Sequence, residues 1–234
     1  MKILNLYAGI GGNRYLWGDD HEITAVELDP NIAEVYKDFY PNDEVIVGDA
    51  HVHLEHNYEA YDFIWSSPPC TTHTRINKNF GFVRYADLKL YQEIIFLKTW
   101  FKGKFCVENV IPYYGQNGLI MPDLIPQLHG RHLFWCNFKI PTTDRRNPEK
   151  QMQQFNAQKK INKVFIKDDD VESLAAKIGM PVIDKKIYVN GNNSPGQLYR
   201  NCVKPELGKM ILDCALDNIN YYENTKQTNL FSDE

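Results

Sequence analysis

Short apolar runs alternate with glycine turns and helical patterns through the first half of the chain, and this alternation limits the possible folds more than any other feature. The runs are Ile3–Tyr7, Glu22–Glu27, Glu44–Val47, Tyr61–Trp65 and Lys104–Val107. Residues Pro30–Tyr40 and Arg84–Phe101 carry apolar side chains at helical spacing. Strands that alternate with helices are typical of a parallel sheet whose connections cross over it. The sequence therefore predicts an α/β fold.

The second half of the chain is less regular. Its apolar patterns predict a strand at Leu133–Phe138, a short helix at Val171–Ile178 and a closing helix at Pro205–Ile219. A polar stretch with neither period, Pro141–Lys163, follows the predicted strand. We therefore expect a core over residues 1–140, a small separate segment over residues 141–167, and a return segment over residues 168–234 whose final helix packs back on the core.

The charge balance excludes a strongly basic protein. Twenty-six Lys and Arg stand against 30 Asp and Glu, a net charge of −4, and 43% hydrophobic with 24% charged residues are typical of a globular chain. Any polyanion must therefore be bound by a local basic face. Apolar runs such as Ile94–Leu97 are far shorter than the roughly 18 residues of a membrane helix, and no secretory leader is visible. We expect a cytoplasmic monomer with no membrane partner.

The five cysteines are scattered and form no CxxC pair, so we expect free thiols. Three of them lie in apolar stretches and are expected in the core, namely Cys106, Cys136 and Cys214. A metal site built from Cys70 and the alternating His51, His53 and His56 is a further hypothesis. Such histidines more often face solvent, and no second cluster completes four ligands, so we expect no metal.

Acidic residues follow the second and third predicted strands, opposite a glycine turn after the first. The turn runs from Tyr7 to Gly12, and its glycines let the backbone approach a ligand closely. A plain strand-to-helix turn would look similar. Glu27 is the feature that favours a ligand, because a carboxylate at the second strand end can accept hydrogen bonds from both hydroxyls of a ribose. Asp49 could accept from an exocyclic amino group, so the three strand ends predict an adenosine-shaped site.

A cysteine and a carboxyl group follow the fourth and fifth predicted strands. The sequence Ser66-Ser67-Pro68-Pro69-Cys70 leaves the fourth strand, and the two prolines stiffen a loop that presents Cys70 beyond the carboxyl edge of the sheet. The alternative is a buried structural cysteine, but the neighbours of Cys70 are prolines and polar residues. Glu108 ends the fifth strand, where it is either a solvated carboxylate or a group that faces the same crevice.

These motifs, in this order, resemble those of the DNA cytosine-5 methyltransferases. The glycine turn, Glu27, Asp49, Pro69-Cys70 and Glu108-Asn109-Val110 each have a counterpart in that family. The resemblance continues at Arg131-His132-Leu133-Phe134, similar to its arginine-bearing strand, and at Asn201–Gly208, similar to its last motif and helix. The chain departs from the family at Asn5, at Thr71-Thr72-His73, at Arg200, and at Gly130 and His132, which stand where arginine is common.

The resemblance implies a Rossmann-like S-adenosylmethionine-dependent methyltransferase fold with a minimal target-recognition segment, residues 141–167. It implies S-adenosylmethionine as cofactor, bound by Tyr7, Ala8, Gly9, Gly11, Gly12, Glu27, Leu28, Asp49, Ala50, Pro68 and Asn201. It implies three catalytic residues, Cys70, Glu108 and Arg131. It implies double-stranded DNA as partner, with contacts from Arg75, Arg145 and Arg146.

The mechanism that the resemblance implies is attack of the Cys70 thiolate on C6 of a cytosine flipped out of the duplex, with Glu108 hydrogen-bonded at N3. Compact size would suit an enzyme of a bacteriophage or a mobile element, and the resemblance implies restriction–modification as a context. Two alternatives stay open: an RNA (tRNA) cytosine-5 methyltransferase, and a catalytically inactive DNA-binding homologue. The presence of both Cys70 and Glu108 argues against the inactive homologue, because a binding module needs neither.

Overall fold

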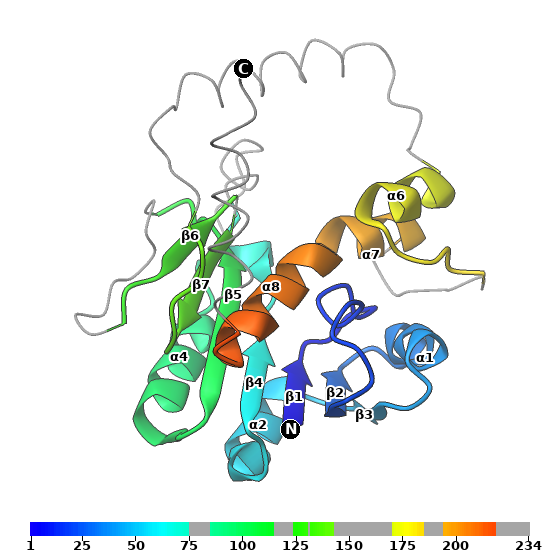
Figure 1. Ribbon diagram of the computed structural model, residues 1–234. Coiled ribbons are helices and arrows are strands. Elements are labelled where there is room, and N and C mark those ends of the chain that lie inside the picture. The colour runs from blue at the N-terminus through cyan, green and yellow to red at the C-terminus, as the bar shows by residue number, and fades with distance from the viewer. Residues whose placement is uncertain (75–84, 115–123, 131, 143–169, 185–193, 219–234) are drawn as a thin grey trace, which may run out of the picture.

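The computed structural model describes residues 1–74, 85–114, 124–130, 132–142, 170–184 and 194–218 (Figure 1). The described strands form a seven-stranded sheet in the order β3-β2-β1-β4-β5-β7-β6. Their bounds are β1 Lys2–Leu6, β2 Glu22–Glu27, β3 Glu44–Val47, β4 Phe63–Ser66, β5 Lys104–Val110, β6 Gln127–His129 and β7 His132–Cys136. The helices are α1 Pro30–Phe39, α2 Ala50–Asn57, α4 Lys89–Trp100, α6 Val171–Ile178, α7 Pro195–Asn201 and α8 Pro205–Ala215, with short 3₁₀ turns at Tyr58–Ala60 and Cys70–Thr72.

The order of the strands creates a crevice at the centre of the sheet. β1 pairs in parallel with both β2 and β4, and β4 pairs in parallel with β5. The chain therefore moves outward from β1 to β3 and then returns to place β4 on the other side of β1. Ligands of open α/β sheets bind at the carboxyl ends of the strands where this reversal occurs. The ends of β1 and β4 are thus the expected site.

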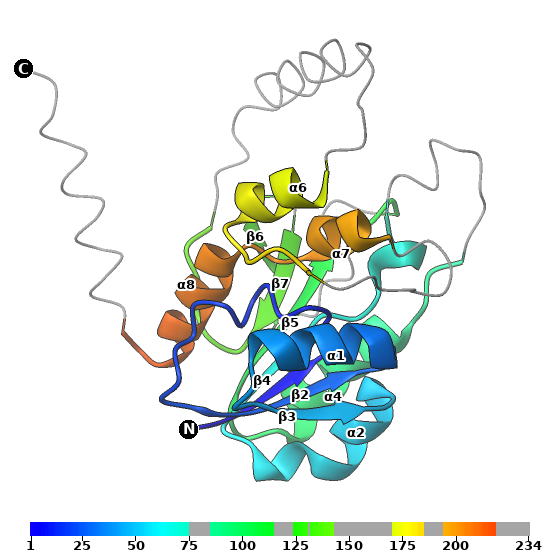
Figure 2. The same cartoon turned by 90° about the vertical axis from the view of Figure 1, so that its right-hand side faces the viewer.

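Helices cover both faces of the sheet. On one face, α2 and α4 bury Leu54, Leu90 and Ile94 in a cluster with the apolar side chains of β1, β4, β5 and β7. On the other face, α8 buries Met210 and Ile211 against alternate residues of the same strands. Figure 2 shows α8 on one side of the strands and α2 on the other. Strands buried on both faces read as continuous apolar runs, which explains the pattern in the sequence.

The return segment packs directly on the glycine turn. A Cβ at Gly12 would lie 2.6 Å from the carbonyl oxygen of Val203, and a Cβ at Gly208 would lie 2.1 Å from that of Asn13. Asn13 is itself held by Asn5, whose Oδ1 accepts from Asn13 Nδ2 at 2.8 Å. Glycine is needed at both positions because helix α8 and the turn approach each other backbone to backbone. Met210 and Ile211 of helix α8 are buried in a cluster with residues of the central strands.

The predicted α/β fold class is confirmed, with differences at several boundaries. Helix α4 begins at Lys89, after the predicted start at Arg84, with Leu88 as its N-cap. Asp87 Oδ1 accepts from the Lys89 amide at 3.0 Å. Helix α8 ends at Ala215, before the predicted Ile219, and Asp217 then takes a left-handed conformation. Elements α2, β6 and α7 were not predicted. Of the polar stretch, residues 143–163 lie outside the described residues.

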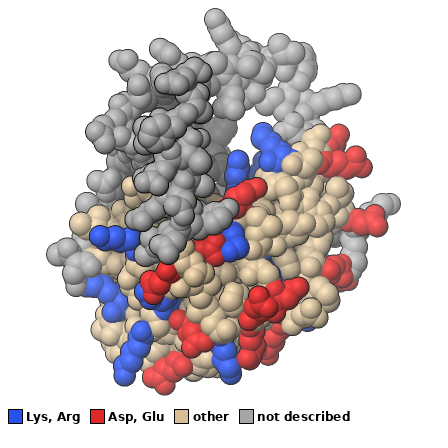
Figure 3. Space-filling view, in the orientation of Figure 1, with Lys and Arg blue, Asp and Glu red and all other residues tan. Residues whose placement is uncertain are grey.

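Charges of both signs are interspersed over the described residues on the face shown in Figure 3. This distribution agrees with the slightly negative net charge of the sequence. Within the parts of the chain that the structure describes, no helix has both the length and the apolar composition needed to cross a bilayer.

Candidate active site

The glycine turn after β1 has a backbone that only a few residue types tolerate. Gly9 and Gly11 have φ values of 55° and 77°, and Tyr7 takes a φ of 54°, which is unusual for a residue with a side chain. At Gly11 a Cβ would lie 2.2 Å from the ring of Tyr40, whereas at Gly9 no atom comes within 4 Å. The turn is therefore tightly packed on its inner side and open at Gly9, where a ligand can approach the backbone.

Glu27 ties the end of β2 to this turn. Its Oε2 accepts from the Gly9 amide at 2.9 Å, and its Oε1 accepts from the Asp29 amide at 3.0 Å. The adjacent Leu28 side chain is 70% exposed. A half-buried carboxylate, an open glycine and an exposed apolar side chain at one strand end fit an adenosine, because they offer acceptors for ribose hydroxyls and an apolar surface for a base.

Asp49 lies at the next strand end and caps α2. Its Oδ1 accepts from the amides of His51 at 2.8 Å and Val52 at 3.3 Å, a typical helix cap. Its Oδ2 lies 3.9 Å from Lys89 Nζ, and the side chain is 45% exposed. The capping bonds fix the position of the carboxylate and leave the second oxygen near the surface. The buried Ala50 follows at the first position of the helix.

The chain turns sharply at Cys70. Pro68 is buried, Cys70 is half-buried, and the Cys70 carbonyl accepts from the amides of His73 at 2.9 Å and Thr74 at 3.0 Å. His73 is buried, and its Nδ1 lies 2.8 Å from the hydroxyl of Tyr114. Burial lowers the pKa of His73. These bonds shape the nucleophile turn, residues 68–74, which is named for the predicted role of Cys70, and they hold its far end to the segment after β5.

Asn109 joins the nucleophile turn to the end of β5. Its Nδ2 donates to the Pro68 carbonyl at 2.9 Å, and its Oδ1 accepts from the Val110 amide at 3.0 Å. Ser66 pairs with Val107 in the sheet, so the segment with Cys70 and the strand end with Glu108 begin from neighbouring positions. Cys70 and Glu108, two of the three predicted catalytic residues, are therefore brought to the same edge of the sheet.

Glu108 has a buried partner on the neighbouring strand β7. Its Oε1 lies 2.8 Å from Nδ1 of His132 on β7, and both side chains are buried. The register of β5 and β7 pairs Glu108 with Phe134 and Val110 with His132, which sets the two side chains diagonally on one face. Sequence reasoning named no partner for Glu108, and Arg131, which it expected near the Cys70 thiolate, lies outside the described residues. His132, noted there only as a departure from the family, was missed as the partner.

Sequence reasoning also missed Glu93, in the middle of α4. Its side chain is 0% exposed and accepts from Tyr7 Oη at 2.5 Å and from Ser66 Oγ at 2.5 Å. His51 Nδ1 lies 3.0 Å from the same carboxylate. Burial and then the charge of Glu93 raise the pKa of Tyr7, and the bond to Glu93 raises the pKa of His51. A glutamate on the apolar stripe of Leu90, Ile94 and Leu97 was the available signal.

The other cysteines have environments unlike that of Cys70. Cys106, Cys136 and Cys214 are buried in the core, as predicted. Burial raises the pKa of the Cys106 thiol, and raises the pKa of Cys202 to about 12 and that of Cys214 to about 11. A high pKa disfavours the thiolate that attacks substrates, so Cys106, Cys202 and Cys214 are unsuited to nucleophilic chemistry.

Several predicted site residues are not brought to this edge by any described contact. Arg75, Arg131, Arg145 and Arg146 lie outside the described residues. Asn201 is exposed at the end of α7, where its Oδ1 accepts from Gln197 Nε2 at 2.8 Å.

The histidines of α2 do not form a cluster with Cys70. Among the described residues, no group of three or more His, Cys, Asp or Glu side chains could hold a metal ion. His51 is buried against Glu93, contrary to the expectation that these histidines face solvent, while His56 Nδ1 lies 2.8 Å from the carbonyl of Val52.

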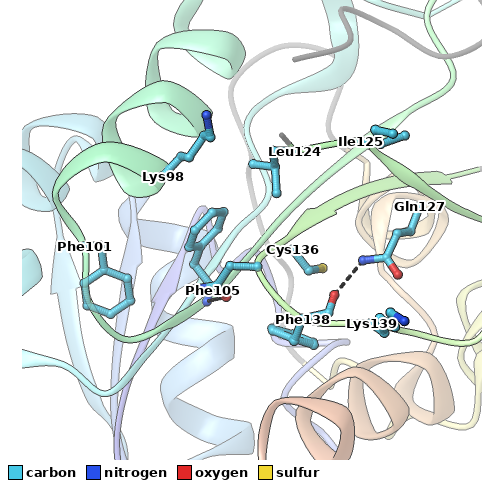
Figure 4. Close-up of a pocket in the computed structure, with 10 residues that line it drawn as sticks. Lys98, Phe101, Phe105, Leu124, Ile125, Gln127, Cys136, Phe138 and Lys139 are labelled. Carbon is cyan, nitrogen blue, oxygen red and sulfur yellow. Dashed lines mark hydrogen bonds between the residues drawn. The ribbon is translucent and has the colours of Figure 1, made fainter. Parts of the chain in front are cut away.

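Cavities lined by described residues include two that contain none of the predicted site residues. The larger, of about 520 Å³, lies between the end of α4 and the edge strands (Figure 4). Its lining includes Phe105, Cys136 and Gln127, whose Nε2 donates to the Phe138 carbonyl at 2.7 Å. The second, of about 390 Å³, lies between α1 and residues 182–184.

This strand order, with acidic strand ends around a glycine turn, defines a Rossmann-like fold of the S-adenosylmethionine-dependent methyltransferase class. The chain belongs to the family described as C-5 cytosine-specific DNA methylase, which residues 1–118 match. The family makes the protein a methyltransferase and implies S-adenosylmethionine as its methyl donor.

Solved structures similar to this chain include a putative methylase from Haemophilus influenzae, with 21% identity, 58% of this chain and 84% of that chain covered, and a TM-score of 0.41. The putative methyltransferase yhhF from Escherichia coli gives 15% identity, 58% and 74% coverage, and a TM-score of 0.40. TrmN from Thermus thermophilus gives 14% identity, 58% and 43% coverage, and a TM-score of 0.38. The comparison with curated proteins gave no match.

Proposed function

We propose that this protein methylates C5 of cytosine in double-stranded DNA through a covalent adduct with Cys70. The observation that carries the proposal is the buried bond from Asn109 Nδ2 to the Pro68 carbonyl, at 2.9 Å. This bond fixes the turn that carries Cys70 against the strand end that carries Glu108. A nucleophile and a carboxyl group on neighbouring strand ends can act on two positions of one pyrimidine ring.

The covalent step answers a problem of reactivity, because C5 of cytosine is a poor nucleophile. Attack of the Cys70 thiolate on C6 forms an S–C6 bond and moves the electrons of the C5–C6 double bond toward C5. S-adenosylmethionine, when bound, supplies an electrophilic methyl group for that carbon. Loss of the C5 proton to a base then restores the double bond and breaks the S–C6 bond, which frees the thiolate.

Glu108, in its protonated form, is proposed to donate a hydrogen bond to N3 of the cytosine ring while Cys70 attacks. Charge builds on the ring during this attack, and a donor held in a buried site stabilises it with little reorganisation. The contact of 2.8 Å with His132 Nδ1 fixes one oxygen of the carboxyl group. The other oxygen can then face the base. Activation of the thiolate by Arg131 or Arg75 stays a prediction from the family resemblance.

The cofactor is proposed to occupy the ends of β1 to β3. Tyr7 and Leu28 would contact the adenine, Glu27 the ribose and Asp49 the adenine amino group. The remaining proposed contacts are Ala8, Gly9, Gly11, Gly12, Ala50, Pro68 and Asn201. These residues supply binding and orientation, and the packed inner side of the glycine turn keeps the backbone in place.

The family description favours DNA as the nucleic acid. A stacked base cannot admit both a thiol and a methyl donor, so the target cytosine should be flipped out of the duplex. Phosphate contacts are proposed for Arg145 and Arg146, because the sequence of residues 141–167 is the most basic of the chain. A further contact is proposed for Arg75, which is close to Cys70 in the sequence.

Trapping with 5-fluorocytosine tests the proposal. Fluorine at C5 cannot leave as a proton after methylation, so the adduct with Cys70 should persist through denaturation. Matched DNA and RNA oligonucleotides that carry the modified base should be compared with wild-type protein, Cys70→Ser and the core variant Cys214→Ala. We expect an adduct on DNA with the wild-type and Cys214→Ala proteins, and none with Cys70→Ser.

Each other outcome has a distinct meaning. An adduct on RNA alone would favour the RNA methyltransferase. An adduct that survives Cys70→Ser would refute the nucleophile assignment. Methylation of DNA without any adduct would refute the covalent mechanism, and a folded protein that binds DNA without methylating it would favour the inactive homologue.

A further inference from the structure

The carboxylate of Glu93 is a buried acceptor on which three donors from different elements converge. Tyr7 Oη reaches Oε1 at 2.5 Å, His51 Nδ1 lies 3.0 Å from the same oxygen, and Ser66 Oγ reaches Oε2 at 2.5 Å. Tyr7 follows β1, Ser66 ends β4 and His51 opens α2. A carboxylate can serve all three because each of its oxygens carries two lone pairs and neither needs to donate.

Each of the three donors lies next to a part of the proposed site. Tyr7 opens the glycine turn and is held in a left-handed conformation, with φ 54°. Ser66 is the last residue of β4, four positions before Cys70. The amide of His51 is capped by Asp49 at 2.8 Å. The carboxylate of Glu93 therefore touches the segments that carry the cofactor contacts and the segment that carries the nucleophile.

We propose that Glu93 is a positioning residue that couples the glycine turn, at Tyr7, to the segment leading from Ser66 to Cys70. The inference rests on the proposed function and adds to it a residue that touches neither substrate nor cofactor. Tyr7 holds an unusual backbone conformation, which persists only where its surroundings fix it. The bond to Glu93 supplies that constraint, and the same carboxylate fixes the end of β4. A change in the contact of Ser66 with Glu93 therefore alters the constraint on Tyr7 in the glycine turn.

Glutamine at position 93 removes this coupling with little change in volume. It has one oxygen to accept hydrogen bonds, and its amide nitrogen would face a hydroxyl or imidazole donor. At least one buried donor then loses its partner, which should weaken cofactor affinity about tenfold or more. Glu55→Gln is the matched control, because Glu55 Oε1 lies 3.5 Å from Nε2 of the same His51 on the solvent side. Its affinity should stay within about twofold of wild type.

The experiment is a double-mutant cycle on the affinity for S-adenosylhomocysteine, measured by calorimetry without nucleic acid. Tyr7→Phe and Ser66→Ala each remove one bond to Glu93, and Tyr7→Phe keeps the ring. In the protein with Glu93 we expect the combined effect to differ from the product of the single effects by more than about twofold. In the Glu93→Gln background the two effects should multiply.

The outcomes separate this inference from the proposed function. If the wild-type protein binds S-adenosylhomocysteine and the effects of Tyr7→Phe and Ser66→Ala on its affinity simply multiply, the coupling is overturned. This test does not depend on the folding of any Glu93 variant. A folded Glu93→Gln protein with unchanged affinity would also overturn it while leaving the proposed function intact. Failure of the wild-type protein to bind S-adenosylhomocysteine would overturn the cofactor assignment and the inference together.

Discussion

Replacing Asn109 by aspartate tests whether the bond to Pro68 sets the position of the nucleophile. Aspartate keeps the shape and can still accept from the Val110 amide, now 3.0 Å away, but it cannot donate to the Pro68 carbonyl. Asn109 is 1% exposed, so the carbonyl loses its partner in a buried place and meets a carboxylate oxygen instead. An unsatisfied buried group costs about 1–3 kcal/mol. A misplacement of about 1 Å near the reacting atoms can lower a rate about 100-fold.

We therefore expect Asn109→Asp to lower the free energy of unfolding by about 1–3 kcal/mol and the single-turnover rate of methyl transfer by about 10- to 100-fold. The measurements are urea unfolding and methyl transfer with saturating DNA and cofactor. Asn137→Asp is the matched control. Asn137 Nδ2 also donates to a carbonyl, that of Gly103 at 2.8 Å, but at the opposite end of β5. It should change stability without changing the rate. A folded Asn109→Asp protein with the wild-type rate would refute the reasoning.

Three further outcomes are expected. Glu27→Ala should weaken S-adenosylhomocysteine binding about tenfold or more, because charge-assisted bonds each contribute about 1.5–3 kcal/mol; unchanged calorimetric affinity would place the cofactor elsewhere. Gly208→Ala should lower the free energy of unfolding by about 1–3 kcal/mol, since its Cβ would lie 2.1 Å from the Asn13 carbonyl; a stable variant in urea unfolding would contradict this packing. Burial lowers the pKa of His73 in the folded protein. The stability that follows from this shift is present above the unfolded pKa of about 6.5 and is lost as pH falls through the folded pKa. His73→Gln should therefore remove this pH dependence from the free energy of unfolding, and an unchanged pH profile would count against a buried neutral ring.

The central strands could be predicted because they are buried on both faces. Such strands read as apolar runs, and β2 was predicted with its observed bounds. The edge strand β3 was also predicted with its observed bounds, although none of its residues is buried. Helix α2 was missed because Ala50–Asn57 is polar around most of its surface. The three-residue strand β6 depends on its antiparallel pairing with β7 and has no pattern of its own. An apolar pattern thus predicts a helix or strand only when the element buries enough of its own side chains to create that pattern.

The same limit applies to the candidate site. Glu27 and Asp49 could be predicted because a strand end is a local feature that determines where its side chain lies. Glu93 and His132 could not be placed in the same way. Their roles depend on how α4 faces the ends of β1 and β4, and on the register between β5 and β7. Those relations arise between elements, so a single carboxylate on an apolar stripe gives only a hint of them.

The contacts around the nucleophile turn explain why a thiol on a loop can be as well placed as one on a strand. Ser66 Oγ donates to Glu93 of α4, and the Pro68 carbonyl accepts from Asn109 of β5. His73 Nδ1 lies 2.8 Å from the Tyr114 hydroxyl. Each of these contacts involves a buried residue, so releasing any one of them leaves a polar group without its partner in the protein interior. The backbone on both sides of Cys70 is therefore fixed, while the residue itself stays half-buried. Covalent attack requires this combination, because the sulfur must reach the substrate and must also lie close to its target before the reaction begins.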